Sequence, residues 1–282
     1  MLTRYVALVS ETDEVSFAQL AEIASALQKQ ATRDFAPIWQ ISATVSVFES
    51  LRQAPSDYWP IIIRDDINEP GAAGYHTDSN GQPYALVQAS ANLSLTCSHE
   101  FMEMLGDPFG NRLVAAHSLK DGQGRVNYLV EVCDPSEGEQ FAYSINGIRV
   151  SDFYTPNFFD PVFAPSVRYS FTGCIERPRQ ILEDGYISWM IPATREWWQA
   201  FVRGGEMTFH RLGVLQRNGR SWRETVDSLT FEPFARLMGG NISHEKRLAA
   251  SFAPQANLQA SSGRADQIHQ DIDNLLSQLR GR

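Results

Sequence analysis

A chain of 282 residues has room for one large domain or two small ones, and its composition of 43% hydrophobic and 20% charged residues is that of an ordinary globular protein. The net charge of -9, with no stripe of lysine and arginine, argues against a nucleic-acid partner. The three cysteines are far apart and odd in number, which is unlike a disulfide framework, so we expect a reducing, cytoplasmic environment. No apolar run is long enough to span a bilayer, and the apolar N-terminus favours a first strand over a signal peptide.

The N-terminal third of the chain predicts one helix among several strands. Ser16 and Gln19 form a capping box, and apolar residues follow at helical spacing, so we expect a helix from Ser16 that ends before Pro37. Runs of β-branched and aromatic residues predict strands, and a Ser-Asn-Gly sequence predicts the turn of a hairpin or edge strand. The expected strands are residues 5–9, 41–48 and 59–63, followed by 75–76 paired with 84–87.

A second helix is expected over residues 92–106, ending at a Gly-Asp-Pro sequence. It is apolar almost all round, which predicts burial, and it contains the sequence HExxE. His99 and Glu103, four residues apart, share one helix face, and an imidazole and a carboxylate that converge are typical ligands of a transition metal. Glu100 flanks that point without occupying it, which is the place of a general base in a zinc hydrolase.

A protein metal site needs at least three ligands, and the third is expected downstream. Glu131 ranks first because it interrupts an apolar strand expected over residues 128–133, where a carboxylate is costly unless it is paired or bound to a metal. Asp134 ranks second, at the end of that strand. Asp107 ranks third, because eight residues of helix separate it from His99 by about 12 Å. Those of these acids that are not ligands are candidates to hold the other ring nitrogen of His99.

Beyond the second helix the pattern is more varied. We expect a strand over residues 186–191, a helix over 195–202 and a helix over 221–238 that Pro233 breaks or kinks. The expected domain organisation is an N-terminal part of residues 1–107, a second part of 108–240, a polar linker of 241–260 and an amphipathic helix of 261–282. That last helix has a narrow apolar stripe, so we expect it to dock on its own domain or on another protein chain.

The segment Ser98-His99-Glu100-x-x-Glu103-x-x-Gly106-Asp107-Pro108, with the later Glu131-x-x-Asp134, resembles the active helix of zincin metallopeptidases that carry HExxE in place of HExxH. The resemblance covers roughly residues 1–135. It implies an α+β, zincin-like fold with a mixed sheet, a buried active-site helix and a cleft completed by the downstream part of the chain. It also implies a zinc-dependent peptidase in which His99 and Glu103 are ligands and Glu100 is the base. Because Glu103 stands where most zincins have histidine, the site is rich in carboxylates and also suits manganese or calcium, although zinc is the expected metal.

A peptidase also needs a hydrogen-bond donor for the oxyanion, and Tyr154 is the first candidate, with His117 and Tyr143 as others. His76 belongs to the expected edge strand, which an extended peptide substrate could join, and has little weight as a site residue. The HExxE sequence also permits a non-catalytic, metal-stabilised binding module, or a metal hydrolase that acts on something other than peptides. A Cys–His nucleophile pair and a di-iron centre lack the sequence signatures that they require.

Overall fold

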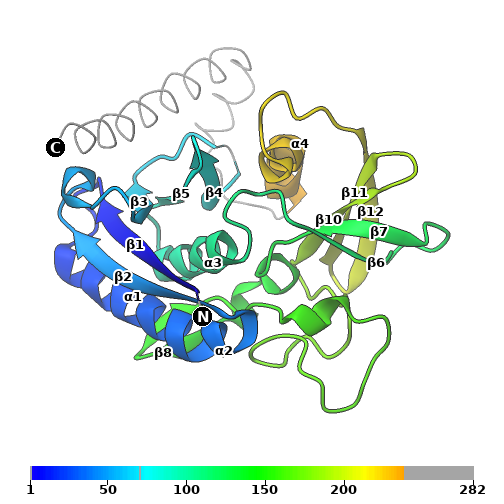
Figure 1. Cartoon of the computed structure of the whole chain (residues 1–282), viewed down its shortest axis with the longest axis horizontal. Helices are drawn as coiled ribbons and strands as arrows, with labels where there is room; N and C mark the ends of the chain where they lie inside the picture. Colours follow the sequence, from blue (N-terminus) through cyan, green and yellow to red (C-terminus); the bar gives the residue numbers. More distant parts are fainter. Residues whose placement is uncertain (1, 70, 238–282) are drawn as a thin grey trace.

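A computed structural model of the chain describes residues 2–69 and 71–237 and shows an α+β protein with two five-stranded sheets (Figure 1). The helices are α1 (Phe17–Lys29), a π-helical segment (Gln30–Phe35), α2 (Ala36–Trp39), α3 (Leu93–Gly106) and α4 (Trp222–Leu237). Single 3-10 turns cover Leu51–Gln53, Asp134–Ser136, Glu139–Phe141 and Pro156–Phe159. The strands are β1 (Leu2–Ser10), β2 (Ile41–Phe48), β3 (Trp59–Arg64), β4 (Gly74–Ser79), β5 (Gln82–Gln88), β6 (Leu113–His117), β7 (Arg125–Leu129), β8 (Tyr143–Ile145), β9 (Ile148–Val150), β10 (Tyr186–Ile191), β11 (Glu196–Arg203) and β12 (Glu206–Val214).

The first sheet is mixed, with strand order β2-β1-β3-β5-β4. Four strands are parallel, and β4 forms the antiparallel edge by pairing with β5 through a hairpin. The expected strands and hairpin of the N-terminal third are therefore confirmed. Helices α1 and α3 pack on the same face of this sheet, where their apolar side chains share one core with alternate residues of β1 such as Val6 and Leu8.

Helix α1 begins as predicted, because the amide of Gln19 donates to the Ser16 hydroxyl. The predicted end before Pro37 is wrong. The chain continues through the π-helical segment into α2, and Pro37 lies in the first turn of α2, where a missing amide proton costs no helical hydrogen bond. The helical run ends instead at Gln40, which adopts a left-handed conformation with φ of 61°.

The second sheet has the order β12-β11-β10-β7-β6 and is antiparallel throughout. The helix predicted over residues 195–202 is wrong, because this segment forms strand β11, which pairs with β10 on one side and β12 on the other. The strand predicted over 128–133 ends at Leu129, so Glu131 lies outside the ladder. Helix α4 continues past position 233 and packs on this sheet through Val226, Leu129 and Trp197.

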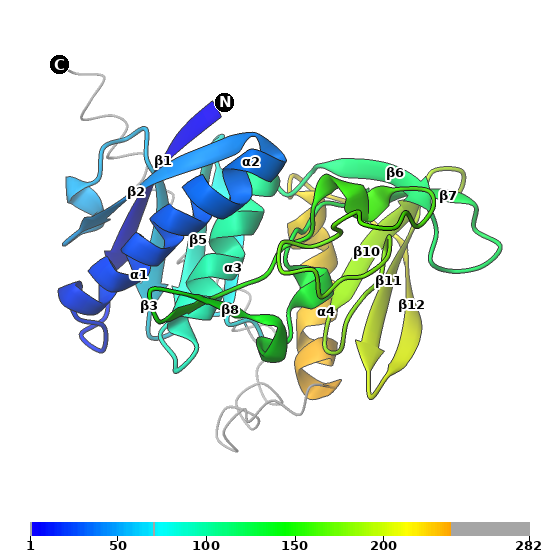
Figure 2. The ribbon, with the colours of Figure 1, turned by 90° about the horizontal axis from the view of Figure 1, so that it is seen from below.

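Helix α3 lies between the two sheets, with β4 and β5 on one side and the second sheet with α4 on the other (Figure 2). Strand β4 approaches α3 closely at Gly74, where a β-carbon would stand 2.9 Å from Glu100 Cγ and 2.8 Å from Thr96 Cγ2. A glycine is thus required for the edge strand to rest on the helix. The domain division predicted near residue 107 falls where the chain leaves α3 and enters the second sheet at β6. The division itself stays a prediction.

The linker predicted over 241–260 and the helix predicted over 261–282 lie outside the described residues. Of the helices that the structure describes, none combines the length and the apolar character needed to cross a bilayer.

Candidate metal centre

The centre of α3 carries the three polar residues that the sequence singled out, and all three are buried. His99 Nε2 lies 3.3 Å from Glu103 Oε1, as expected for residues four apart on a helix. The carboxylate of Glu103 is fully buried and accepts the amide of Cys133 at 3.2 Å through the same oxygen. The His99 side chain keeps 11% of its surface exposed, so it stands at the opening of an otherwise closed cluster.

Asp134 brings a second carboxylate to His99 from the downstream part of the chain. Its Oδ1 lies 3.2 Å from His99 Nε2, and the Asp134 side chain is buried. Asp134 opens a 3-10 turn, and the turn is held close to Gly185, where a β-carbon would stand 2.8 Å from the carbonyl oxygen of Asp134. One ligand atom from each of His99, Glu103 and Asp134 therefore lies within 4.8 Å of the others.

Arg223, near the start of α4, is the residue that sequence reasoning missed. Its Nη1 donates to Glu103 Oε2 at 2.5 Å and also to Glu131 Oε2, while its Nε lies 3.2 Å from Asp227 Oδ2. Glu131, ranked first as the third ligand, is thus the partner of an arginine, and the structure brings Asp134 to His99 in its place. The sequence predicts that a buried Glu131 needs a partner, either a metal ion or an opposite charge. In the structure that partner is the guanidinium of Arg223.

His76 on β4 approaches the same cluster from the edge of the first sheet. Its Nδ1 lies 3.4 Å from Glu100 Oε2 and 3.8 Å from Glu103 Oε2, and its Nε2 lies 3.0 Å from the main-chain oxygen of Asp107. The imidazole is buried. One ligand atom from each of His76, Glu100 and Glu103 lies within 4.8 Å of the others, so these residues form a second group of possible ligands, which the sequence does not single out at His76.

The other residues predicted for the site, the three candidate oxyanion donors and Asp107, do not contribute a ligand atom to either group. Tyr154 is fully buried and its hydroxyl has no hydrogen-bond partner in the described part of the chain, while Glu131 and Glu103 are near enough to raise its pKa further than burial alone. Tyr143 donates its hydroxyl to Asp34. The other two candidates are His117, which is exposed at the hairpin end of β6, and Asp107, whose carboxylate accepts the amide of Arg112 and not the ring of His99.

Burial and mutual attraction set the protonation of this cluster. Burial would lower the pKa of His99, but Glu103 and Asp134 outweigh it and hold that pKa well above its usual value. Burial and the neighbouring Glu103 raise the pKa of Asp134 to about 7. Glu103 has the opposite shift, because Arg223 and His99 overcome its burial and hold its pKa well below the usual value. Burial raises the pKa of Glu131 despite Arg223.

The spacing of the first group fits a small divalent ion. Two zinc–ligand bonds of about 2.1 Å at a tetrahedral angle place the ligand atoms about 3.4 Å apart. The separations from His99 Nε2 to Glu103 and Asp134 are 3.3 and 3.2 Å, and both carboxylates are buried. One imidazole and two carboxylates form a donor set that suits zinc or manganese.

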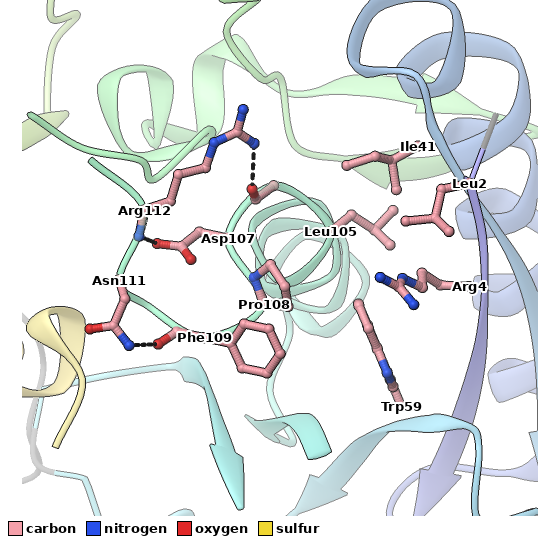
Figure 3. Close-up of a pocket in the computed structure, with 11 residues that line it drawn as sticks. Leu2, Arg4, Ile41, Trp59, Leu105, Asp107, Pro108, Phe109, Asn111 and Arg112 are labelled. Atoms are coloured by element: carbon pink, nitrogen blue, oxygen red, sulfur yellow. Dashed lines mark hydrogen bonds between the residues drawn. The ribbon is translucent and has the colours of Figure 1, made fainter. Parts of the chain in front are cut away.

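A separate cavity of about 370 Å³ opens at the C-terminal end of α3 (Figure 3). Its lining is mostly apolar and includes Leu2, Leu105 and Phe109, with the guanidinium of Arg4 4.8 Å above the ring of Trp59. Neither His99 nor a carboxylate of the first ligand group lines it. The cavity is therefore distinct from the metal centre, although both lie along α3.

Comparisons with family models, with curated proteins and with solved structures return no match to this chain.

Proposed function

We propose that this chain is a metal-dependent hydrolase, with zinc as the preferred ion, and that it cleaves peptide bonds. The observation that carries the proposal is the convergence of His99, Glu103 and Asp134 at ligand spacing with Glu100 beside them on the same helix. The order of elements before α3 supports a zincin-like reading, since a strand, a helix, two more strands and an antiparallel edge hairpin precede the helix. The edge strand β4 rests on α3 at Glu100, where an extended substrate could pair with it.

In this proposal His99, Glu103 and Asp134 hold the ion, which supplies a Lewis acid and lowers the pKa of a bound water. Glu100 accepts the proton of the attacking water and later delivers it to the leaving amine. Its Oε2 is buried and has no hydrogen-bond partner among the described residues, so no protein donor holds the carboxylate through that oxygen. Cys133 and Arg223 each donate to one oxygen of Glu103, which fixes the orientation of the carboxylate between them.

The second candidate is a metal-stabilised binding module without catalysis. Arg223 favours it, because this guanidinium already neutralises part of the charge of Glu103, and so does the burial of all but the edge of His99. Glu100 opposes it, because a structural ion needs no carboxylate poised beside its ligands. Hydrolysis of an unfolded protein substrate by the metal-loaded chain, and its loss on chelation, separates the two candidates.

Metal content tests the ligand assignment. His99→Ala and Asp134→Ala are expected to lose most of the ion at the first group after dialysis, whereas Glu131→Gln is expected to keep it, because Glu131 contacts Arg223 and not His99. Elemental analysis of the three variants beside the wild type gives the answer, with Glu22→Gln on the exposed surface of α1 as the control. Full metal occupancy in Asp134→Ala would contradict the assignment, and loss in Glu131→Gln would restore Glu131 as a ligand.

Metal binding is expected to release protons near neutral pH. His99 has a raised pKa and Asp134 has a pKa of about 7, so both tend to hold protons below that pH, and the ion has to displace them. Affinity should therefore fall as the pH drops through 7. Calorimetric titration with zinc at about pH 6.5 and 8.5, in buffers of different ionisation enthalpy, measures the release. A heat that is independent of the buffer at the lower pH would contradict the expectation.

A further inference from the structure

The imidazole of His76 is held in one orientation that exposes a nitrogen to carboxylates. Its Nε2 faces the main-chain oxygen of Asp107 at 3.0 Å, and because a carbonyl only accepts, Nε2 carries the proton of that hydrogen bond. In the neutral ring, Nδ1 is then a bare lone pair. It faces Glu100 Oε2 at 3.4 Å and Glu103 Oε2 at 3.8 Å. Arg223 donates to one of these oxygens, Glu103 Oε2, whereas a buried lone pair on each of the other two atoms needs a donor or a cation.

Neither His76 Nδ1 nor Glu100 Oε2 has a hydrogen-bond partner within the part of the chain that the structure describes, and both side chains are more than nine-tenths buried. The separation of 3.4 Å is long for a hydrogen bond to a ring nitrogen, but it is the spacing of two ligands of one small divalent ion. The wider separation of 3.8 Å corresponds to a more open angle at the ion. His76 Nδ1 and Glu100 Oε2 therefore have the separation expected of two ligands of the same ion.

The geometry points to a second divalent-cation site, formed by His76, Glu100 and Glu103, that shares Glu103 with the first. This inference rests on the proposed function, because it makes Glu103 the bridge of a two-ion centre. Each oxygen of Glu103 belongs to one site: Oε1 lies toward His99 and Oε2 lies toward His76. Bridging carboxylates of this kind hold ions about 3.5–4 Å apart in two-metal hydrolases.

Charge in the cluster supports a second ion. Glu100, Glu103, Glu131, Asp134 and Asp227 are all buried, and the arginine among them is Arg223. These five carboxylates outnumber that guanidinium, so a second divalent ion bound among them would meet the negative charge of those that are ionised. Arg223 pairs with one atom of the second site, Glu103 Oε2, at 2.5 Å, but its nearest approach to Glu100 Oε2 is 3.9 Å, and His76 Nδ1 and Glu100 Oε2 stay without a hydrogen-bond partner among the described residues.

The second site is compatible with Glu100 as the base. Oε2 faces His76, whereas Oε1 lies toward β4, 3.1 Å from the point where a β-carbon on Gly74 would stand. One oxygen can therefore bind the cation while the other accepts a proton beside the edge strand. A cation held by His76 would also orient Glu100, which makes His76 a positioning residue for the reaction.

Metal stoichiometry of the full chain tests the inference. The metal-stripped protein, titrated separately with zinc and with manganese, is expected to bind two equivalents. His76→Gln, whose amide can still donate to the oxygen of Asp107, is expected to bind one equivalent normally and the second at least 100-fold more weakly. His117→Gln, at an exposed histidine, is the matched control and should bind two. Bound manganese should also give the spin coupling of two adjacent ions in wild type and lose it in His76→Gln.

Nitrogen chemical shifts of the wild-type imidazole provide a readout that does not depend on the folding of a variant. Nδ1 of His76 is expected to shift on the second equivalent of zinc, and His99 on the first. A single equivalent in wild type, with His76→Gln unchanged, overturns the second site and leaves the proposed function standing. So does a His76 ring that is protonated on both nitrogens at every zinc concentration. Metal binding that survives His99→Ala but not His76→Gln supports the site at His76 and overturns the proposed function instead.

Discussion

Glu100→Gln is expected to slow peptide hydrolysis by a factor on the order of 10²–10⁴, the usual contribution of a general base. The amide has the shape of the carboxylate and fits beneath Gly74 in the same way, but it has no lone pair of sufficient basicity to accept the proton of water. The ion held by His99, Glu103 and Asp134 should stay, because the Glu100 carboxylate does not belong to that group of ligands.

Initial rates on an unfolded protein substrate, with zinc content and thermal unfolding measured on the same preparation, test this expectation. Glu22→Gln removes one carboxylate from the exposed face of α1 and should match the wild type in all three measurements. A Glu100→Gln protein that cleaves as fast as wild type would place the base elsewhere. A wild-type chain that binds zinc and cleaves nothing would favour the non-catalytic module.

The candidate site could be found in the sequence as far as it depends on local spacing. His99, Glu100 and Glu103 lie within one turn and a half of one helix, so the periodicity of the helix alone predicts that their side chains are neighbours. The burial of that helix follows from its apolar composition. Ligands from distant segments carry no such signal. The sequence ranks Asp134 below Glu131 because a charge inside an apolar run needs a partner, which a metal would supply, but in the structure Arg223, 92 residues away, is that partner.

The errors in secondary structure have two origins. Residues 195–202 contain Trp197, Ala200 and Phe201, whose spacing is compatible with a helix, but pairing with a strand on each side makes this segment an inner strand of a sheet. The chain after Leu129 leaves the ladder because it turns toward α3, where the amide of Cys133 donates to Glu103. The partners of Cys133 lie far away in the sequence, at Glu103, whereas those of β11 are the neighbouring strands β10 and β12, so the wrong helix over residues 195–202 is an error in assigning the local period.

Arg223 is the residue whose loss should most affect stability. It is almost completely buried and contacts carboxylates from three elements: Glu103 and Glu100 on α3, Glu131 after β7, and Asp227 on its own helix. Removal of one partner from a buried ion pair typically costs 3–5 kcal/mol, because the remaining charge has neither water nor a counter-ion. Arg223→Met keeps most of the side-chain volume and removes the charge, so we expect the metal-free protein to lose about 3–5 kcal/mol of its free energy of unfolding.

The pH dependence distinguishes a lost ion pair from lost packing. Arg223 holds the pKa of Glu103 below its unfolded value, so the stabilisation is present above the unfolded pKa of about 4.5 and disappears as the pH falls through the lower, folded value. The difference between wild type and Arg223→Met in urea unfolding should therefore be largest near neutral pH and shrink in acid. Arg211→Met, which breaks an exposed pair with Glu196, should unfold like wild type. An Arg223→Met variant as stable as wild type at neutral pH would show that this guanidinium does not stabilise the packing of α4 against α3. A destabilisation that does not change with pH would assign the loss to packing.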